Sequence, residues 1–110
     1  MRKSDITKST GNVFADLGLD APEELQVKAA LMSTVAVLLG ERKLTQKAAA
    51  KLLGIDQPKV SALVNGRMSL FLTERLMEFL IALGNDVEIV VKKRARSRGP
   101  GRIQVVSAPA

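Results

Sequence analysis

Two short helical segments joined by a glycine turn constrain the fold of this chain more than any other feature. The first segment, QKAAAKLL (46–53), follows Thr45, whose hydroxyl can cap a helix, and it ends before Gly54, which favours the left-handed conformation of a helix end. Asp56 can cap a second helix over residues 57–65. Since so few residues separate the two segments, the chain must turn sharply there and pack one helix against the other.

Apolar residues at helical spacing predict further helices on both sides of this pair. A long helix begins at about Ala21 with Asp20 as its N-cap, and another helix runs from about Thr73 to Leu83. The core face expected for the long helix consists of Leu25, Ala29, Met32, Ala36 and Leu39, widened by Leu31, Val35 and Leu38. The apolar stripe expected for the other helix consists of Leu72, Leu76, Phe79, Leu80 and Leu83.

Beyond these helices the hydrophobic period changes to two. The alternation in residues 86–94 predicts a β strand, and residues 102–107, which follow a Gly-Pro-Gly turn, are a candidate second strand. We therefore expect a mostly α fold, a bundle of four to five helices with a short C-terminal β strand or hairpin. The expected domain covers 22–85, after an N-terminal arm at 1–21, and the chain ends in a basic, flexible tail at 95–110.

The composition excludes several classes of function. The chain has no cysteine and no histidine, so it has no disulfide, no Cys/His zinc site and no imidazole base. Its acids and lysines form no recognisable catalytic motif, and we expect neither an enzyme nor a bound cofactor or metal. The longest apolar stretch, 29–40, is too short to span a bilayer, and no signal peptide is evident. We therefore expect a cytoplasmic protein that does not enter a membrane.

Basic residues gather in two places. The formal net charge of the chain is +6, and residues 92–110 carry basic side chains without a single acid. A second basic window, 42–67, contains one acid, Asp56. Both windows are suited to polyanions such as nucleic acid, although a run of like charges in a tail is most often simply solvated.

The helix expected over 57–65 has two unlike sides. At 100° per residue, Val60 and Leu63 share one side, flanked by Val64. The opposite side is short, polar and uncharged, and consists of Pro58, Ser61, Ala62 and Asn65, with Gln57 at its front edge. Such a face suits the DNA major groove, where glutamine can pair with adenine, serine can serve several bases, and proline or alanine can meet a thymine methyl group.

The stretch LTQKAAAKLLGIDQPKVSALVNGR (44–67) resembles the helix-turn-helix of the Cro/CI-type phage repressors, the XRE family. The resemblance lies in the glutamine at the start of both helices, the alanine and glycine at the turn, the apolar residues at 60 and 63, and the closing Asn-Gly. GNVFADLGL before the first helix and ALGNDVEIVVKKR after the fourth are similar to HigA-type antitoxins, which are encoded beside a RelE-like toxin. One departure is Leu72, which follows Phe71 where the family usually has a Ser or Thr cap.

The resemblance implies a phage-repressor-like helix-turn-helix bundle that binds double-stranded DNA. It assigns the reading of bases to Gln57, Pro58, Ser61 and Ala62. It assigns a phosphate contact to Gln46, which would also brace Gln57, and backbone contacts to Asn65 and Arg67. Charge and position alone add Lys43, Lys47 and Lys59 to the phosphate contacts.

The family resemblance also predicts a role and partners. It implies a transcriptional repressor of a bacterium or phage, in particular an autoregulating type II antitoxin that neutralises a RelE-like toxin through Val13, Phe14 and Leu17. Paired recognition helices favour a homodimer on a palindromic operator. The unpaired edge of the strand could be covered by residues 103–106, by a second copy or by a partner protein. Two alternatives remain, a stand-alone phage-type repressor and a protein-interaction module without specific DNA binding.

Overall fold

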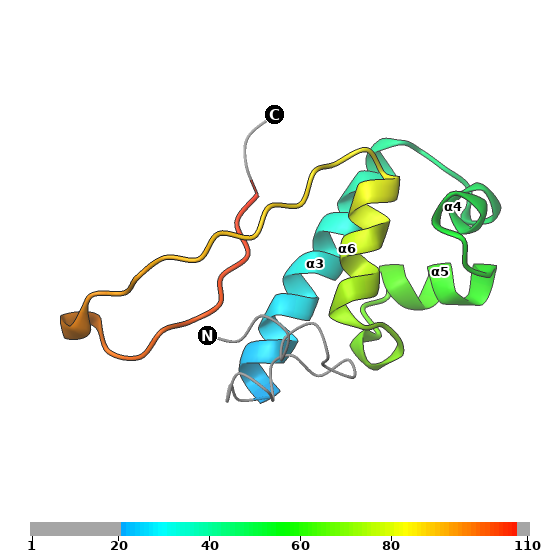
Figure 1. The fold of residues 1–110 in the computed structure, drawn as a ribbon. Coiled ribbons are helices and arrows are strands. Elements are labelled where there is room, and N and C mark those ends of the chain that lie inside the picture. Colours follow the sequence, from blue (N-terminus) through cyan, green and yellow to red (C-terminus); the bar gives the residue numbers. More distant parts are fainter. Residues whose placement is uncertain (1–20, 108–110) are drawn as a thin grey trace.

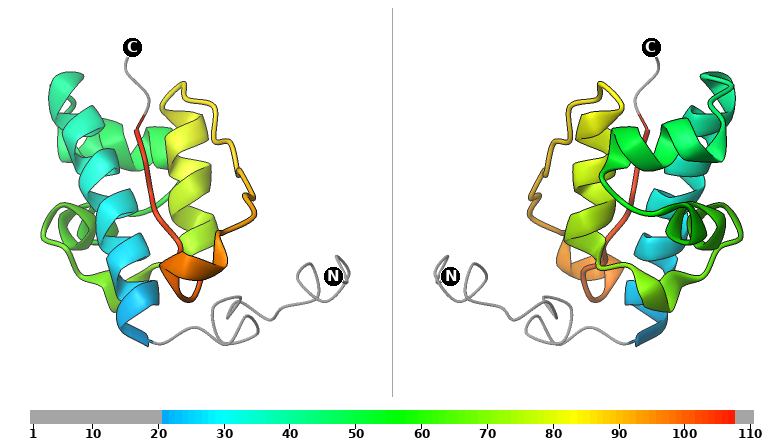
Figure 2. Two further views of the ribbon diagram at one scale, coloured as in Figure 1. Left: turned by 90° about the vertical axis from the view of Figure 1, so that its left-hand side faces the viewer. Right: turned by 90° about the vertical axis from the view of Figure 1, so that its right-hand side faces the viewer.

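The computed structural model describes residues 21–107, which form a small helical bundle followed by an extended segment (Figure 1). Its elements in chain order are α3 (Ala21–Glu41), α4 (Gln46–Leu53), α5 (Gln57–Val64), the 3-10 helix η1 (Met68–Leu70), α6 (Thr73–Ala82) and the 3-10 helix η2 (Arg96–Arg98). Helices α3 and α6 lie side by side, and α4 and α5 lie together on one side of that pair (Figures 1 and 2). The predicted positions of all four α-helices are confirmed.

Local side-chain chemistry explains where the two short helices begin. The Thr45 hydroxyl accepts a hydrogen bond from the backbone N–H of Ala48 at 3.1 Å, which caps α4. The Asp56 carboxylate accepts from the N–H of Lys59 at 2.9 Å, which caps α5. Each cap satisfies an amide that has no partner within its own helix, so these helix starts are determined by residues close to them in sequence.

The core is mostly aliphatic and is centred on α3, which contacts both α5 and α6. Val35, Leu63 and Leu76 are fully enclosed, and the rings of Phe71 and Phe79 pack edge to face with their centroids 6.0 Å apart. The buried set within residues 21–107 contains only apolar side chains, namely Val27, Leu31, Met32, Val35, Leu39, Ala49, Ala50, Leu53, Val60, Ala62, Leu63, Phe71, Leu76, Phe79, Leu80 and Leu83.

The buried face of α3 differs from the expected one. Leu25, which we expected in the core, is 47% exposed, and Ala29 is also exposed. The buried stripe instead begins at Val27 and continues at four-residue steps through Leu31, Val35 and Leu39, with Met32 beside it. Helix α3 carries apolar residues around most of its circumference, so its sequence does not mark one face, and the positions of α5 and α6 decide which side is covered.

The predicted C-terminal strand or hairpin is wrong for the described chain. Residues 21–107 contain no β strand, and both 86–94 and 102–107 are extended without a ladder of hydrogen bonds between them. A period-two pattern makes a segment suitable for a sheet, but a strand exists only when a neighbouring backbone pairs with it. The pattern was therefore sufficient to predict an extended backbone and insufficient to predict a sheet.

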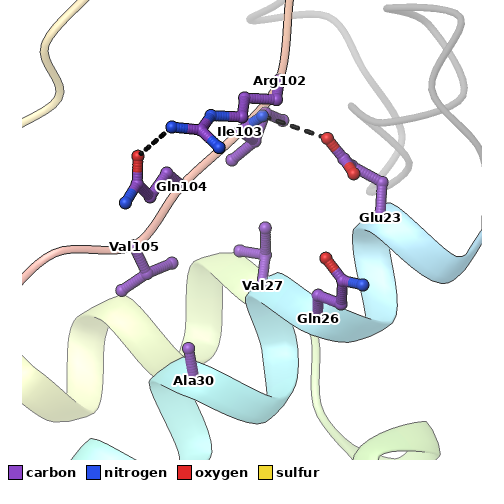
Figure 3. A pocket seen from close by; sticks show the side chains of 8 residues that line it. All are labelled: Glu23, Gln26, Val27, Ala30, Arg102, Ile103, Gln104 and Val105. Atoms are coloured by element: carbon purple, nitrogen blue, oxygen red, sulfur yellow. Dashed lines mark hydrogen bonds between the residues drawn. The ribbon is translucent and has the colours of Figure 1, made fainter.

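Residues 102–105 are attached to the start of α3. The backbone N–H of Ile103 donates to the Glu23 carboxylate at 3.1 Å, and Ile103 and Val105 pack against the core as half-buried side chains (Figure 3). Figures 1 and 2 show that this segment lies over the side of the α3–α6 pair opposite to α4 and α5. The predicted toxin-contact residues Val13, Phe14 and Leu17, and the N-terminal arm that carries them, lie outside the described residues.

Candidate nucleic-acid interface

The turn between α4 and α5 sets the position of the candidate recognition helix. Gly54 adopts a left-handed conformation with φ of 73°, and its N–H and that of Ile55 both donate to the carbonyl of Ala50, at 2.9 and 3.0 Å. A side chain at position 54 would be strained at this φ, because only glycine adopts it readily. Ala50 is buried, and its small side chain permits close approach of the two helices.

Arg75 of α6 braces this turn from outside. Its guanidinium makes long hydrogen bonds to the carbonyls of Leu53 and Gly54, at 3.4 and 3.5 Å, and lies 4.9 Å from the centre of the Phe79 ring. It also pairs with Glu78 at 2.8 Å. A cation at the C-terminal end of α4 is favoured by the helix dipole. This contact was not predicted from the sequence, although the spacing of Arg75 and Phe79 by four residues on one helix is a signal for a cation–π pair.

The outward side of α5 carries most of the residues predicted to read bases. Gln57 and Pro58 are exposed at the first turn, and Ser61 is half-buried in the middle of the helix. The Asn65 amide, just beyond the C-terminal end, donates to the Ser61 hydroxyl at 3.3 Å. We call this surface, with Gln57, Pro58, Ser61 and Asn65, the outer face; it is polar and uncharged, as the sequence indicated.

Ala62 does not belong to the outer face, which corrects its predicted position. Its side chain is only 7% exposed, whereas Val64, which we expected beside the core residues, is 45% exposed. Helix α5 contacts α3, α4 and η1, so it is covered on more sides than the one that carries Val60 and Leu63. As a buried side chain, Ala62 cannot reach a base in this conformation, whereas Val64 is an exposed apolar residue of α5 that lies at the hollow between α3 and the end of this helix.

Four exposed basic residues lie before, within and after the outer face in the sequence. We call Lys43, Lys47, Lys59 and Arg67 the basic rim. Gln46 is exposed at the first position of α4, and among the described residues no hydrogen bond joins it to Gln57. Arg42, from the same basic window, has a different role, because its guanidinium donates to the carbonyl of Leu83 at 2.6 Å and so caps the end of α6.

Two hollows in the described part of the chain contain no group of catalytic or metal-binding side chains. One hollow of about 250 Å³ lies between the start of α3 and residues 102–105, where Glu23 is the acidic lining residue and already bonds Ile103 (Figure 3). Another, of about 350 Å³, lies between α3 and the end of α5. Within residues 21–107 no three acidic side chains are grouped so as to hold a metal ion. No helix in this part of the chain is long and apolar enough to cross a membrane.

Two short helices at a glycine turn, the second with an uncharged polar outer face and a basic rim, define a helix-turn-helix DNA-binding domain. A family model described as a helix-turn-helix domain matches residues 13–92. A solved structure named as an XRE family transcriptional regulator is similar at 48% sequence identity with a TM-score of 0.78, over 81% of this chain and 100% of that one. The chain belongs to the XRE family of helix-turn-helix DNA-binding regulators and is not an enzyme.

No curated protein sequence matches the chain at a significant level. The two matches identify the family, and neither assigns the chain to the HigA-type antitoxins.

Proposed function

We propose that this regulator is a sequence-specific transcriptional repressor that reads the major groove with the outer face of α5. One observation carries the proposal: α5 buries Val60 and Leu63 and presents an uncharged surface on its other side, where Gln57 and Pro58 are exposed and Ser61 is half-buried. An ordinary solvent-facing helix would more often carry Glu and Lys at these positions, which have better helix propensity. Uncharged donors and acceptors such as those of glutamine and serine can hydrogen-bond to base edges in the major groove.

The side chains of the outer face differ in the contacts that they can make. Gln57 can form paired hydrogen bonds with adenine, and Ser61 can donate to or accept from several bases. Pro58 offers apolar surface for a thymine methyl group. Val64 takes the apolar role that the sequence analysis assigned to Ala62, because Val64 is exposed and Ala62 is buried. The Ser61 hydroxyl accepts from Asn65 and keeps its own O–H available to donate to a base.

The basic rim supplies the affinity that does not depend on sequence. Lys43, Lys47, Lys59 and Arg67 contact phosphates in this proposal, and each contact releases counterions from the DNA. Gln46 also contacts phosphate from the start of α4, where backbone amides and the helix dipole favour an anion. Asn65 and Arg67 hold the DNA backbone after α5. These contacts fix the register in which the outer face meets the bases.

The biological role that we propose is that of a cytoplasmic, autoregulating type II antitoxin that acts as a homodimer on a palindromic operator. The similarity of GNVFADLGL and ALGNDVEIVVKKR to HigA-type antitoxins supports this role. In it, Val13, Phe14 and Leu17 contact a RelE-like toxin. The test is co-purification of the full chain with the product of an adjacent toxin-like gene, which Phe14→Ser and Leu17→Ser should abolish while DNA binding persists. Failure to co-purify would favour a stand-alone repressor.

The DNA-binding proposal is tested by fluorescence anisotropy on a duplex from the upstream region of the gene and on a scrambled duplex, each over a salt series. Gln57→Ala should cost about 1 to 3 kcal/mol on the upstream duplex and much less on the scrambled one, because it removes a base contact. Lys59→Ala should weaken both duplexes similarly and reduce the salt slope by about 1.

The matched control is Lys28→Ala, which removes the same charge from α3, outside the 42–67 window, and should leave both affinities nearly unchanged. Equal losses on the two duplexes for Gln57→Ala would remove Gln57 from base reading. If neither Gln57→Ala nor Lys59→Ala changes binding, the chain is a protein-interaction module instead.

A further inference from the structure

Residues 86–94 are an extended segment whose backbone has no partner in the described chain. Among residues 21–107, no hydrogen bond involves the N–H or C=O groups of this segment. Ile89, Val90 and Val91 in its centre are 78%, 68% and 89% exposed. Three consecutive apolar side chains are exposed to water here, on a backbone whose N–H and C=O groups are free to form hydrogen bonds. These features are typical of a β strand without a paired strand beside it.

The order of charges along residues 86–94 indicates which kind of strand is complementary to this segment. Its acids, Asp86 and Glu88, come first, with Val87 between them packed against the core. The apolar run of Ile89, Val90 and Val91 lies in the centre, and the bases, Lys92, Lys93 and Arg94, come last. A sequence of this kind is complementary to itself in the antiparallel direction. When two copies are aligned about Val90, Glu88 lies opposite Lys92, Asp86 opposite Arg94, and Ile89 opposite Val91.

We propose that residues 86–94 pair with the same residues of a second copy in an antiparallel, two-stranded β ribbon with its two-fold axis at Val90. A symmetric dimer must use a self-complementary surface, and this segment meets that requirement. The pairing places Glu88 beside Lys92 of the partner subunit and Lys92 beside Glu88 of the partner subunit, so each opposite-charge pair forms twice. The inference supplies the interface of the homodimer, and its biological role rests on the proposed repressor function.

Neighbouring registers satisfy the pattern less well. A shift of the axis to Ile89 places Glu88 opposite Val90, and a shift to Val91 places Ile89 opposite Lys93. Only the axis at Val90 gives both acids a basic partner and keeps Ile89, Val90 and Val91 opposite apolar residues. The side-chain alternation of a strand also excludes half-step registers, which would bring opposite faces together.

The other extended segment of the same chain is a poorer partner. Residues 102–107 contain one base, Arg102, and the segment is already attached to α3 through the hydrogen bond from Ile103 to Glu23. Ile103 and Val105 are half-buried against the core, whereas Val90 remains exposed. The ribbon also leaves the DNA-binding surface free, because residues 85–107 lie on the side of the α3–α6 pair opposite to α4 and α5 (Figures 1 and 2).

The first test is a charge exchange followed by sedimentation equilibrium of the full chain without DNA. Glu88→Lys and Lys92→Glu each create two like-charge pairs across the two-fold axis, and each should weaken dimerisation by about ten-fold. The double variant restores opposite charges and should return the dimer dissociation constant to within about two-fold of the parent protein. Glu41→Lys, an equal charge change at the exposed end of α3, is the control and should leave dimerisation unchanged.

The second test uses the absence of cysteine from the chain. Val90→Cys places its thiol beside that of the partner subunit, so mild oxidation should give a covalent dimer. Val106→Cys, which is 74% exposed on the neighbouring segment, is the control and should stay mainly monomeric under the same conditions. A parent protein that sediments as a monomer would overturn the proposal, and so would single charge variants whose weakened association the double variant does not rescue.

These outcomes are independent of the proposed function. If the charge variants dissociate but still prefer a half-site duplex over a scrambled one, both proposals hold, and the loss of operator affinity measures the contribution of bivalent binding. If the parent dimerises as expected yet binds both duplexes equally, the ribbon stands and sequence-specific repression fails. Efficient cross-linking of Val106→Cys in place of Val90→Cys would assign the interface to residues 102–107 and overturn the inference.

Discussion

At the scale of single residues, Lys43 combines backbone strain with a proposed contact to DNA. It has a φ of 54°, in the left-handed region, and it is the only residue other than glycine with positive φ in the described chain. The left-handed conformation is unfavourable by roughly 1 to 2 kcal/mol for a residue that has a Cβ atom. The position follows the end of α3, where a glycine or asparagine would be the ordinary choice. Strain of this kind is compatible with a lysine retained for its charge.

Lys43→Gly should therefore have opposite effects on stability and on binding. Relief of the strained φ should raise the free energy of unfolding by about 1 kcal/mol, measured by urea denaturation. Loss of the ammonium group should weaken binding to both duplexes and reduce the salt slope by about 1. An unchanged salt slope would remove Lys43 from the basic rim's phosphate contacts.

Leu72 is a second residue whose identity conflicts with its position. It is the N-cap of α6, it makes no side-chain hydrogen bond there, and it is 54% exposed. Leu72→Ser should stabilise the protein by about 1 kcal/mol, because a hydroxyl at this position can accept from a free amide of the first turn. Leu70→Ser is the control, since Leu70 is 52% exposed but lies in η1 and caps no α-helix. An equal gain in both variants would show that reduced apolar exposure, rather than capping, is the cause.

At the scale of elements, the geometry of the helix-turn-helix depends on a helix outside it. Arg75 connects α6 to the turn through the carbonyls of Leu53 and Gly54 and through the face of Phe79. The recognition helix is thus held by its packing on α3 and α4 and, indirectly, by α6. Changes in α6 can reach the DNA-binding surface by this route.

Arg75→Ala should lower the free energy of unfolding by roughly 1 to 2 kcal/mol, since it removes the cation–π contact and the hydrogen bonds to the end of α4. Glu78→Ala removes only the exposed ion pair with Arg75 and should cost less than about 1 kcal/mol. Thermal denaturation of both variants measures the difference. Equal losses would mean that the ion pair, rather than the contact with the turn, accounts for the effect of Arg75.

At the scale of the whole molecule, the two basic regions have separate structural settings. The basic rim lies around α4 and α5, while the basic C-terminal residues follow an extended path on the other side of the α3–α6 pair (Figure 2). The same path includes Ile103 and Val105, which pack against the core. Deletion of residues 95–110 would therefore remove charge and packing together.

Substitution separates these two effects. Arg96→Ser with Arg98→Ser should leave the unfolding free energy nearly unchanged, since both side chains are exposed, and should change binding to upstream and scrambled DNA only slightly and equally, since this segment lies on the side of the bundle opposite to α4 and α5 (Figure 1). Ile103→Ala should lower stability by about 1 kcal/mol, because a half-buried side chain loses part of its contact with the core. A selective loss on the upstream duplex in the arginine variant would instead indicate that the basic tail takes part in sequence reading.

The sequence by itself determined the helix ends and the family. Thr45, Gly54 and Asp56 act on amides and carbonyls within a few residues of themselves, so their effect can be predicted from neighbouring positions. The outer face was also predicted correctly at Gln57 and Ser61. The pattern within α5 was sufficient there, because these uncharged polar residues differ chemically from the core residues on the opposite side of the helix.

Tertiary structure alone decided which remaining surfaces are covered. It buried Val27 in place of Leu25 and Ala62 in place of Val64, and it left residues 86–94 extended without a sheet. It also placed Arg75 against the turn. Each of these outcomes depends on elements that are distant in sequence and come together only in the folded chain. Helix ends follow from local hydrogen bonding, whereas burial and strand pairing require a neighbour that the local sequence does not specify.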